Sequence, residues 1–217
     1  MAEIQDRIRK HADDLICRYG LLKDAKESII DAYLIMQETY ENDGKLLIAG
    51  NGGSAADAEH MTGELMKRFK KPRPISKALS DSLIATDRDI GSRLSLNLDR
   101  ALMAIPLTAH DALTTAYIND ADGYGVFAQQ LFGYGRKGDT FLAITTSGNS
   151  SNILNAAVLA RALGIKVIAL TGKSGGRIKD FADVCVRVNE EETYKIQELH
   201  LPIYHTWCLM LEDHFFG

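Results

Sequence analysis

Two side chains that can do chemistry, His60 and Glu64, stand four residues apart in a stretch with helical spacing. Residues at this separation lie on the same face of a helix, so the imidazole and the carboxylate would be neighbours. Such a pair can share a metal ion or act as an acid–base couple, although it is more commonly a solvated surface contact. Arg68 extends the same face by another turn and could reach a phosphate.

A second group of side chains that could bind a metal ion lies in "YKIQELHLPIYH" near the end of the chain: Gln197, His200 and His205. Taken alone, these histidines are more typical of core or surface positions than of a site. Gln197 and His205 are separated by about 12 Å of helical rise. To reach one metal ion, their side chains would have to lean together, Pro202 would have to distort the helix, or two chains would have to supply the ligands. The sequence leaves these arrangements open.

Two stretches, "LLIAGNGGSAADAEH" and "FLAITTSGNSSNILN", combine an apolar run, a polar glycine-containing loop and a helical pattern. A loop that leads into a helix offers free N–H groups and the positive end of the helix dipole, which suits a phosphate. Helix caps and turns use the same residue types, but two such loops together favour a ligand site. Neither loop has a Walker or G-x-G-x-x-G pattern, which disfavours a nucleotide. The candidate contacts are Gly52, Gly53, Ser54, Thr145, Thr146, Ser147, Gly148 and Ser150.

The elements that would position these residues alternate between strand and helix. Short apolar runs at 45–50, 139–145, 165–172 and 183–188 are typical of strands buried on both faces. Helical patterns at 54–69 and 151–163, and a weaker one at 175–182, lie between them. Such alternation predicts an α/β fold with a parallel sheet between layers of helices. Residues 1–41 and 193–216 are also predicted to be helical, 101–110 to form a further strand, and 70–100 to form a loop-plus-helix excursion.

Composition restricts the class of protein. The formal net charge is −4, which gives no indication of a nucleic-acid or membrane partner. The three cysteines are far apart and suit a reducing compartment. The charged N-terminus has no apolar signal core, and no apolar run approaches the roughly 20 residues of a membrane span. These features predict a single cytoplasmic globular domain over 1–217.

Four motifs in order, "GNGGSAADAEHMTGEL", "TTSGNSSNIL", "VIALTGKSGG" and "IQELHLPIYH", resemble the sugar isomerase (SIS) domain and, more narrowly, the phosphoheptose isomerases. The resemblance covers the chain except 70–100. It implies a three-layer flavodoxin-like parallel sheet with an N-terminal helical extension that helps to build a homotetramer. It also implies active sites at subunit interfaces, conversion of sedoheptulose 7-phosphate to D-glycero-D-manno-heptose 7-phosphate, and a role in heptose synthesis for lipopolysaccharide and other surface glycans.

The resemblance also assigns roles to individual residues. It implies that Glu64 and His205 are the catalytic acid–base pair, and that one metal ion per subunit, usually zinc, is held by His60, Glu64, Gln197 and His205. The implied substrate contacts are Asn51, Gly52, Gly53, Ser54, Glu64, Arg68, Asn119, Asp120, Thr145, Thr146, Ser147, Ser150 and Gln197. Because Glu64 would serve as both ligand and base, its two roles would alternate.

Alternative functions follow from the departures from the family pattern. Residues 70–100 are expected to form an insertion near the pocket rim, which leaves isomerisation of another sugar phosphate open. Lys195 stands where the family usually has arginine. A third hypothesis is a non-catalytic SIS protein that binds a partner of the replication-initiator type. That role would not require the acid–base and metal residues that this chain retains.

Overall fold

Five parallel strands form the centre of the computed structural model, which describes residues 5–217. The strand order is β2-β1-β3-β4-β5, and every neighbouring pair is parallel. This is the order of a flavodoxin-like doubly wound sheet, so the predicted fold class is confirmed. The strands are β1 (Leu46–Ala49), β2 (Ala104–Pro106), β3 (Thr140–Ile144), β4 (Lys166–Thr171) and β5 (Val184–Arg187).

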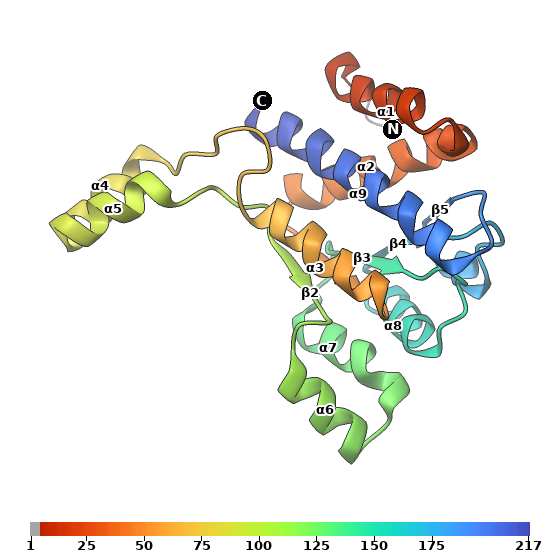
Figure 1. Cartoon of the computed structure of the whole chain (residues 1–217). Helices are drawn as coiled ribbons and strands as arrows, with labels where there is room; N and C mark the ends of the chain where they lie inside the picture. Colours follow the sequence, from red (N-terminus) through yellow and green to blue (C-terminus); the bar gives the residue numbers. More distant parts are fainter. Residues whose placement is uncertain (1–4) are drawn as a thin grey trace.

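Helices cover both faces of the sheet, which explains the continuous apolar runs of the strands (Figure 1). In β1, Leu46 and Ile48 join the core on one face, whereas Leu47 and Ala49 join the core on the other. One face is packed against α1 (Asp6–Arg18), α2 (Lys26–Glu41), α3 (Gly53–Met66) and α9 (Thr193–Phe216). The other is packed against α7 (Val126–Tyr134) and α8 (Ser151–Ala162).

The N-terminal helical extension is part of the core rather than a free arm. Ile8 and Leu15 of α1 are buried in the same cluster as the residues of α9. His11 Nε2 also lies 3.2 Å from Asp213 Oδ2, and Trp207 Nε1 donates a hydrogen bond to the Ile29 carbonyl at 2.9 Å. A short 3₁₀ helix, η1 (Gly20–Ala25), joins α1 to α2. Residues 1–4 of the predicted extension lie outside the described residues.

The segment 70–100 forms a helical hairpin that extends away from the body of the molecule (Figure 1). Its helices are α4 (Lys77–Thr86) and α5 (Arg88–Asn97), and no residue of α4 is buried. The base of the hairpin is fixed by a buried ion pair, because Arg73 Nε lies 2.9 Å from Glu212 Oε1 and both side chains are at most 1% exposed. The excursion predicted from the sequence is therefore two helices.

Smaller elements complete the chain. The predicted strand near 101–110 is confirmed as β2, and α6 (Asp111–Asp120) and η2 (Gly123–Gly125) follow it. The weak helical pattern at 175–182 yields only the 3₁₀ helix η3 (Arg177–Asp180). Within residues 5–217, no helix has the length and apolar character needed to cross a membrane.

Candidate active site

Helices α3 and α9 bring His60, Glu64 and His205 together. The two helices pack in the same direction, since Gly53 touches Gln197 near their first turns and Phe69 is hydrogen-bonded to Glu212 beyond the last turn of α3. His60 Nε2 lies 3.5 Å from Glu64 Oε1. The rings of His60 and His205 are perpendicular, with centroids 5.0 Å apart. The carboxylate from the first half of the chain and the imidazole from its last helix thus share one site.

The electrostatic environment keeps the His205 imidazole neutral near pH 7. Burial lowers the pKa of His205, the neighbouring His60 lowers it further, and Glu64 opposes this shift. The other oxygen of Glu64, Oε2, accepts a hydrogen bond from Lys67 Nζ at 3.0 Å. A neutral imidazole beside a carboxylate is suited to moving protons.

The donor chemistry of this cluster fits a metal ion. His205 Nε2 is buried and has no hydrogen-bond partner, which is costly unless another group satisfies it. His60 Nε2 and Glu64 Oε1 face the same region, and imidazole nitrogen and carboxylate oxygen are ligands that zinc accepts. Within residues 5–217, no three His, Cys, Asp or Glu side chains stand close enough to hold a metal ion without movement. Metal binding would therefore require the side chains to come closer together than they stand in this structure.

Gln197 does not join the cluster within one chain. Its side-chain amide lies against Gly53, where an added Cβ would come within 2.5 Å of Gln197 Nε2. Helix α9 continues through Pro202 without interruption, so a distortion at Pro202 does not carry Gln197 toward His205. Of the arrangements that the sequence left open, a distortion of the helix at Pro202 is therefore not observed.

The two glycine-containing loops meet at the carboxyl ends of β1 and β3. The amides of Asn51 and Asn152 exchange two hydrogen bonds, of 3.0 and 2.8 Å. Ser150 stands at the N-cap position of α8, but its hydroxyl lies 3.3 Å from Thr145 Oγ1 and caps no N–H group. A simple capping role for Ser150 is therefore not supported.

Glycine is required where the second loop touches the loop after β4. Gly148 has φ of +68°, and a Cβ there would collide with the backbone of Gly175 and Gly176. Across the same contact, Asn149 Oδ1 accepts a hydrogen bond from the Arg177 N–H at 3.0 Å. Tight packing thus holds the 144–150 loop in one conformation.

A hollow of about 540 Å³ opens beside this loop. Its lining comes from the segments after β3, β4 and β5 and from the first turn of α9, where parallel sheets commonly bind ligands. In the described part of the chain, the N–H groups of Ser150 and Ser151 have no acceptor and remain free for an anion. The lining residues are Thr146, Ser147, Asn149, Lys173, Ser174, Glu190, Glu191 and Ile196.

Of the predicted substrate contacts, Thr146 and Ser147 line the hollow, whereas three of the others have partners elsewhere. Arg68 lies beyond the end of α3 and pairs with Asp99 at 2.9 Å, so it does not extend the face of His60 and Glu64. Asn119 and Asp120 end α6, and Asn119 donates a hydrogen bond to Asp120 at 2.8 Å. None of these three lines the hollow.

Several residues near the hollow had no role in the sequence prediction. Lys173 and Ser174 lie within the motif "VIALTGKSGG", and Asn152 lies within "TTSGNSSNIL", so the motifs contained the signal. Glu190 and Glu191 follow a strand that the apolar pattern had located. The general position of polar residues after parallel strands could have identified both groups. No residue of 70–100 lines the hollow, so this segment does not form its rim within one chain.

Known proteins are similar to this chain over most of its length. The SIS domain family model matches residues 114–211, and a second SIS domain model matches 18–100. "Phosphoheptose isomerase 2" of Campylobacter jejuni is 36% identical over 222 aligned residues, covering 100% of this chain and 96% of that protein. A phosphoheptose isomerase of Nitratiruptor sp. is 38% identical and covers 86% of each chain.

Solved structures give the same result. The phosphoheptose isomerase GmhA of Neisseria gonorrhoeae superposes with a TM-score of 0.70 at 31% identity, covering 96% of this chain and 98% of that one. A phosphoheptose isomerase from Francisella tularensis gives a TM-score of 0.72 at 32% identity, covering 96% and 97%. The similarity thus extends over nearly the whole of each chain.

Proposed function

We propose that this chain, which belongs to the phosphoheptose isomerase family of SIS-domain proteins, converts sedoheptulose 7-phosphate to D-glycero-D-manno-heptose 7-phosphate. Family membership makes the chain an aldose–ketose isomerase. The observation that carries the proposal is the meeting of Glu64 and His205 between α3 and α9, where the first turn of α9 borders the hydroxyl-lined hollow through Ile196.

The phosphate would bind where α8 begins. The free N–H groups of Ser150 and Ser151 and the helix dipole suit an anion, and the hydroxyls of Thr146 and Ser147 add donors. The carboxylates of Glu190 and Glu191 suit the sugar hydroxyls better than the phosphate. From Gln197 to His205, α9 rises about 12 Å, which is of the order of an extended seven-carbon sugar phosphate. Binding of the phosphate at one end would therefore align C1 and C2 near Glu64 and His205.

The reaction moves a proton between C1 and C2 through an enediol or enediolate. Glu64 would remove the C1 proton and return one to C2, since its carboxylate lies in the cluster beside His60. His205, neutral because of its lowered pKa, would exchange protons with the O1 and O2 oxygens. Each transfer restores the starting state of the two side chains at the end of a turnover.

Zinc is the proposed cofactor, with His60, Glu64 and His205 as the ligands that one chain can supply. When bound, zinc would polarise the carbonyl and stabilise negative charge on its oxygen. Gln197 of the same chain lies beside Gly53, so this amide would take part as a ligand only through a second subunit. Glu64 would then alternate between its ligand and base roles.

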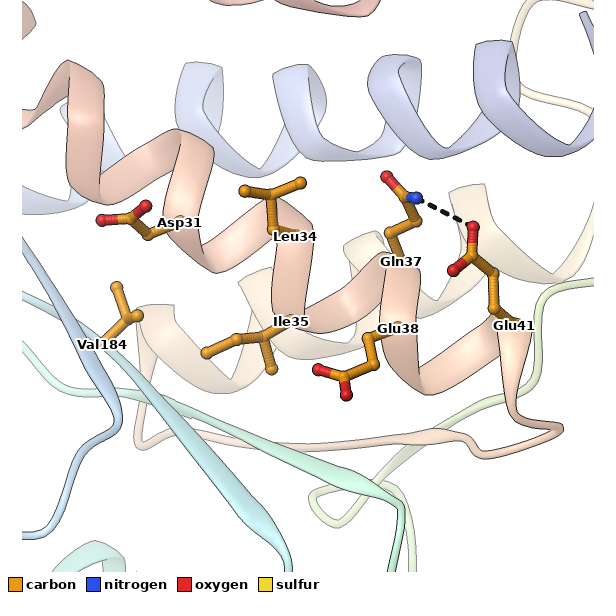
Figure 2. Close-up of a pocket in the computed structure, with 7 residues that line it drawn as sticks. All are labelled: Asp31, Leu34, Ile35, Gln37, Glu38, Glu41 and Val184. Carbon is orange, nitrogen blue, oxygen red and sulfur yellow. Dashed lines mark hydrogen bonds between the residues drawn. The ribbon is translucent and has the colours of Figure 1, made fainter. Parts of the chain in front are cut away.

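A homotetramer is the proposed assembly, and a groove of about 520 Å³ on α2 supports a subunit contact there (Figure 2). Leu34 and Ile35 of α2 and Val184 of the edge strand β5 form its apolar part. Asp31, Glu38 and Glu41 of α2 also line the groove (Figure 2). Sedimentation of the purified protein tests the proposal, with a single species of four chains expected and a monomer contradicting it.

The activity is tested with purified protein, zinc and sedoheptulose 7-phosphate, following aldoheptose formation. Turnover that is lost in Glu64→Gln supports the proposal, and wild-type activity equal to that of Glu64→Gln rejects it. A panel of other sugar phosphates separates this substrate from the alternative substrates. Stable capture of a replication-initiator-type protein without turnover on any sugar phosphate would favour the non-catalytic alternative.

A further inference from the structure

Beside the proposed catalytic cluster lies a buried tyrosine that links two residues of α3. The Tyr204 hydroxyl donates a hydrogen bond to Asp57 Oδ1 at 3.3 Å and lies 3.0 Å from His60 Nδ1. Asp57 and His60 are three residues apart on α3, so both face α9. Tyr204 is 1% exposed, and its ring packs edge-on against both His60 and His205. This geometry leaves the hydroxyl little freedom to move.

The direction of these hydrogen bonds fixes the protonation pattern of His60. A phenol has one proton to donate, and Tyr204 donates it in a hydrogen bond to Asp57, because an ionised carboxylate can only accept. The Tyr204 oxygen can then only accept from His60, so Nδ1 of the neutral ring must carry the proton. His60 Nε2 is left with a free lone pair that faces Glu64 Oε1 at 3.5 Å. Two acceptors facing each other are favourable only with a cation between them.

We propose that Tyr204 and Asp57 are positioning residues that hold His60 in its Nδ1–H tautomer, with Nε2 presented as a ligand. The proposal rests on the metal role given to His60 under the proposed function. Outer hydrogen bonds of this kind fix the orientation of ligand histidines and commonly change metal affinity by about 10- to 100-fold. Neither residue touches the substrate in this proposal, and both act through His60.

The tautomer is measured directly by nitrogen-15 NMR of histidine-labelled, metal-free protein at neutral pH, with His60→Gln identifying the His60 signal. The wild-type signal should show a protonated Nδ1 and an unprotonated Nε2. In Asp57→Leu the phenol keeps its proton free to donate to Nδ1, so the signal should shift toward the Nε2–H form. In Tyr204→Phe the preference for Nδ1–H should be lost. An Nε2–H ring in the wild type, or no change in either variant, would overturn the proposal.

Zinc affinity provides the second readout, by competition with a chromophoric chelator. Tyr204→Phe should bind zinc about 10- to 100-fold more weakly than the wild type. Tyr40→Phe is the matched control, because it removes a hydroxyl bonded to the Met103 carbonyl away from the site, and its affinity should be unchanged. Equal affinity of Tyr204→Phe and wild type would overturn the positioning role alone. A wild type that binds no zinc would reject the metal role, while the NMR measurement would still decide the tautomer.

Discussion

Asn51 and Asn152 exchange a pair of hydrogen bonds, with nitrogen–oxygen distances of 3.0 and 2.8 Å. Asn51 follows β1, and Asn152 lies in the first turn of α8, which follows β3. Because β1 and β3 are neighbours in the sheet, the amide pair ties the two glycine-containing loops together at the same edge. It therefore couples the proposed phosphate cradle to the start of α3, the helix that carries His60 and Glu64.

Removing one half of this amide pair should weaken substrate binding. Asn51→Asp keeps an acceptor for the Asn152 amide but loses the donor to Asn152 Oδ1, so one hydrogen bond is lost. We expect KM for the sugar phosphate to rise several-fold while kcat changes less, since a lost bond is worth about 0.5–1.5 kcal/mol. Steady-state kinetics measure both constants. Asn155→Asp, further along α8, is the control, and an equal effect there would contradict a specific role.

The buried His200 should make stability depend on pH. Burial lowers the pKa of His200 to about 4, and the Thr171 backbone opposes this shift. The unfolded chain, with a pKa near 6.5, binds the proton first, so His200 lowers the free energy of unfolding as the pH falls from about 6.5 to about 4. From pH 7.5 to pH 5 this loss should be about 2 kcal/mol.

Urea unfolding of the wild type and of His200→Leu at both pH values isolates this contribution, since other titrating groups are shared. The variant should lose less stability on acidification than the wild type. Parallel losses in the two proteins would show that His200 does not titrate in this range.

Replacing Glu212, at the base of the 70–100 hairpin, should lower the free energy of unfolding. This buried carboxylate pairs with Arg73 and accepts hydrogen bonds from the backbone N–H groups of Phe69, Lys70 and Lys71, at 2.8–3.0 Å. Glu212→Gln would leave the Arg73 charge buried without its partner. We expect a loss of about 3–5 kcal/mol in the free energy of unfolding, measured by urea denaturation.

The exposed pair of Lys77 and Asp81 on α4 is the matched control. Lys77→Ala should change the free energy of unfolding by less than about 1 kcal/mol, because solvent screens an exposed ion pair. If Glu212→Gln were as mild as Lys77→Ala, the buried pair would not anchor the hairpin.

The sheet was predictable from the sequence because its strands are buried on both faces. The runs at 45–50, 139–145, 165–172 and 183–188 are apolar at successive positions, and alternate side chains enter different cores. The hairpin was harder to predict because α4 buries no residue and so shows no clear apolar face. The Arg73–Glu212 pair at its base joins distant positions, which residue spacing does not reveal.

For the candidate site, spacing predicted contacts within a helix but not contacts between helices. His60 and Glu64 meet as their four-residue separation indicates. The rise of about 12 Å between Gln197 and His205 indicated that the two side chains lie far apart on one helix. Helix α9 is continuous through Pro202, so this separation is kept. Arg68 was misplaced because α3 ends at Met66, two residues earlier. The link from Asp57 to Tyr204 depends on the packing of α3 against α9, which no local pattern shows.

Isomerisation in deuterium oxide tests proton transfer by Glu64 most directly. Sedoheptulose 7-phosphate is incubated with zinc-loaded protein, and NMR follows both the aldoheptose formed and the deuterium at its C2. The wild type should incorporate solvent deuterium at C2, and Glu64→Gln should lower the rate of aldoheptose formation by about 10²- to 10⁴-fold. Complete transfer of the original C1 hydrogen to C2, at the same rate in the wild type and in Glu64→Gln, would contradict the role of Glu64 as the base.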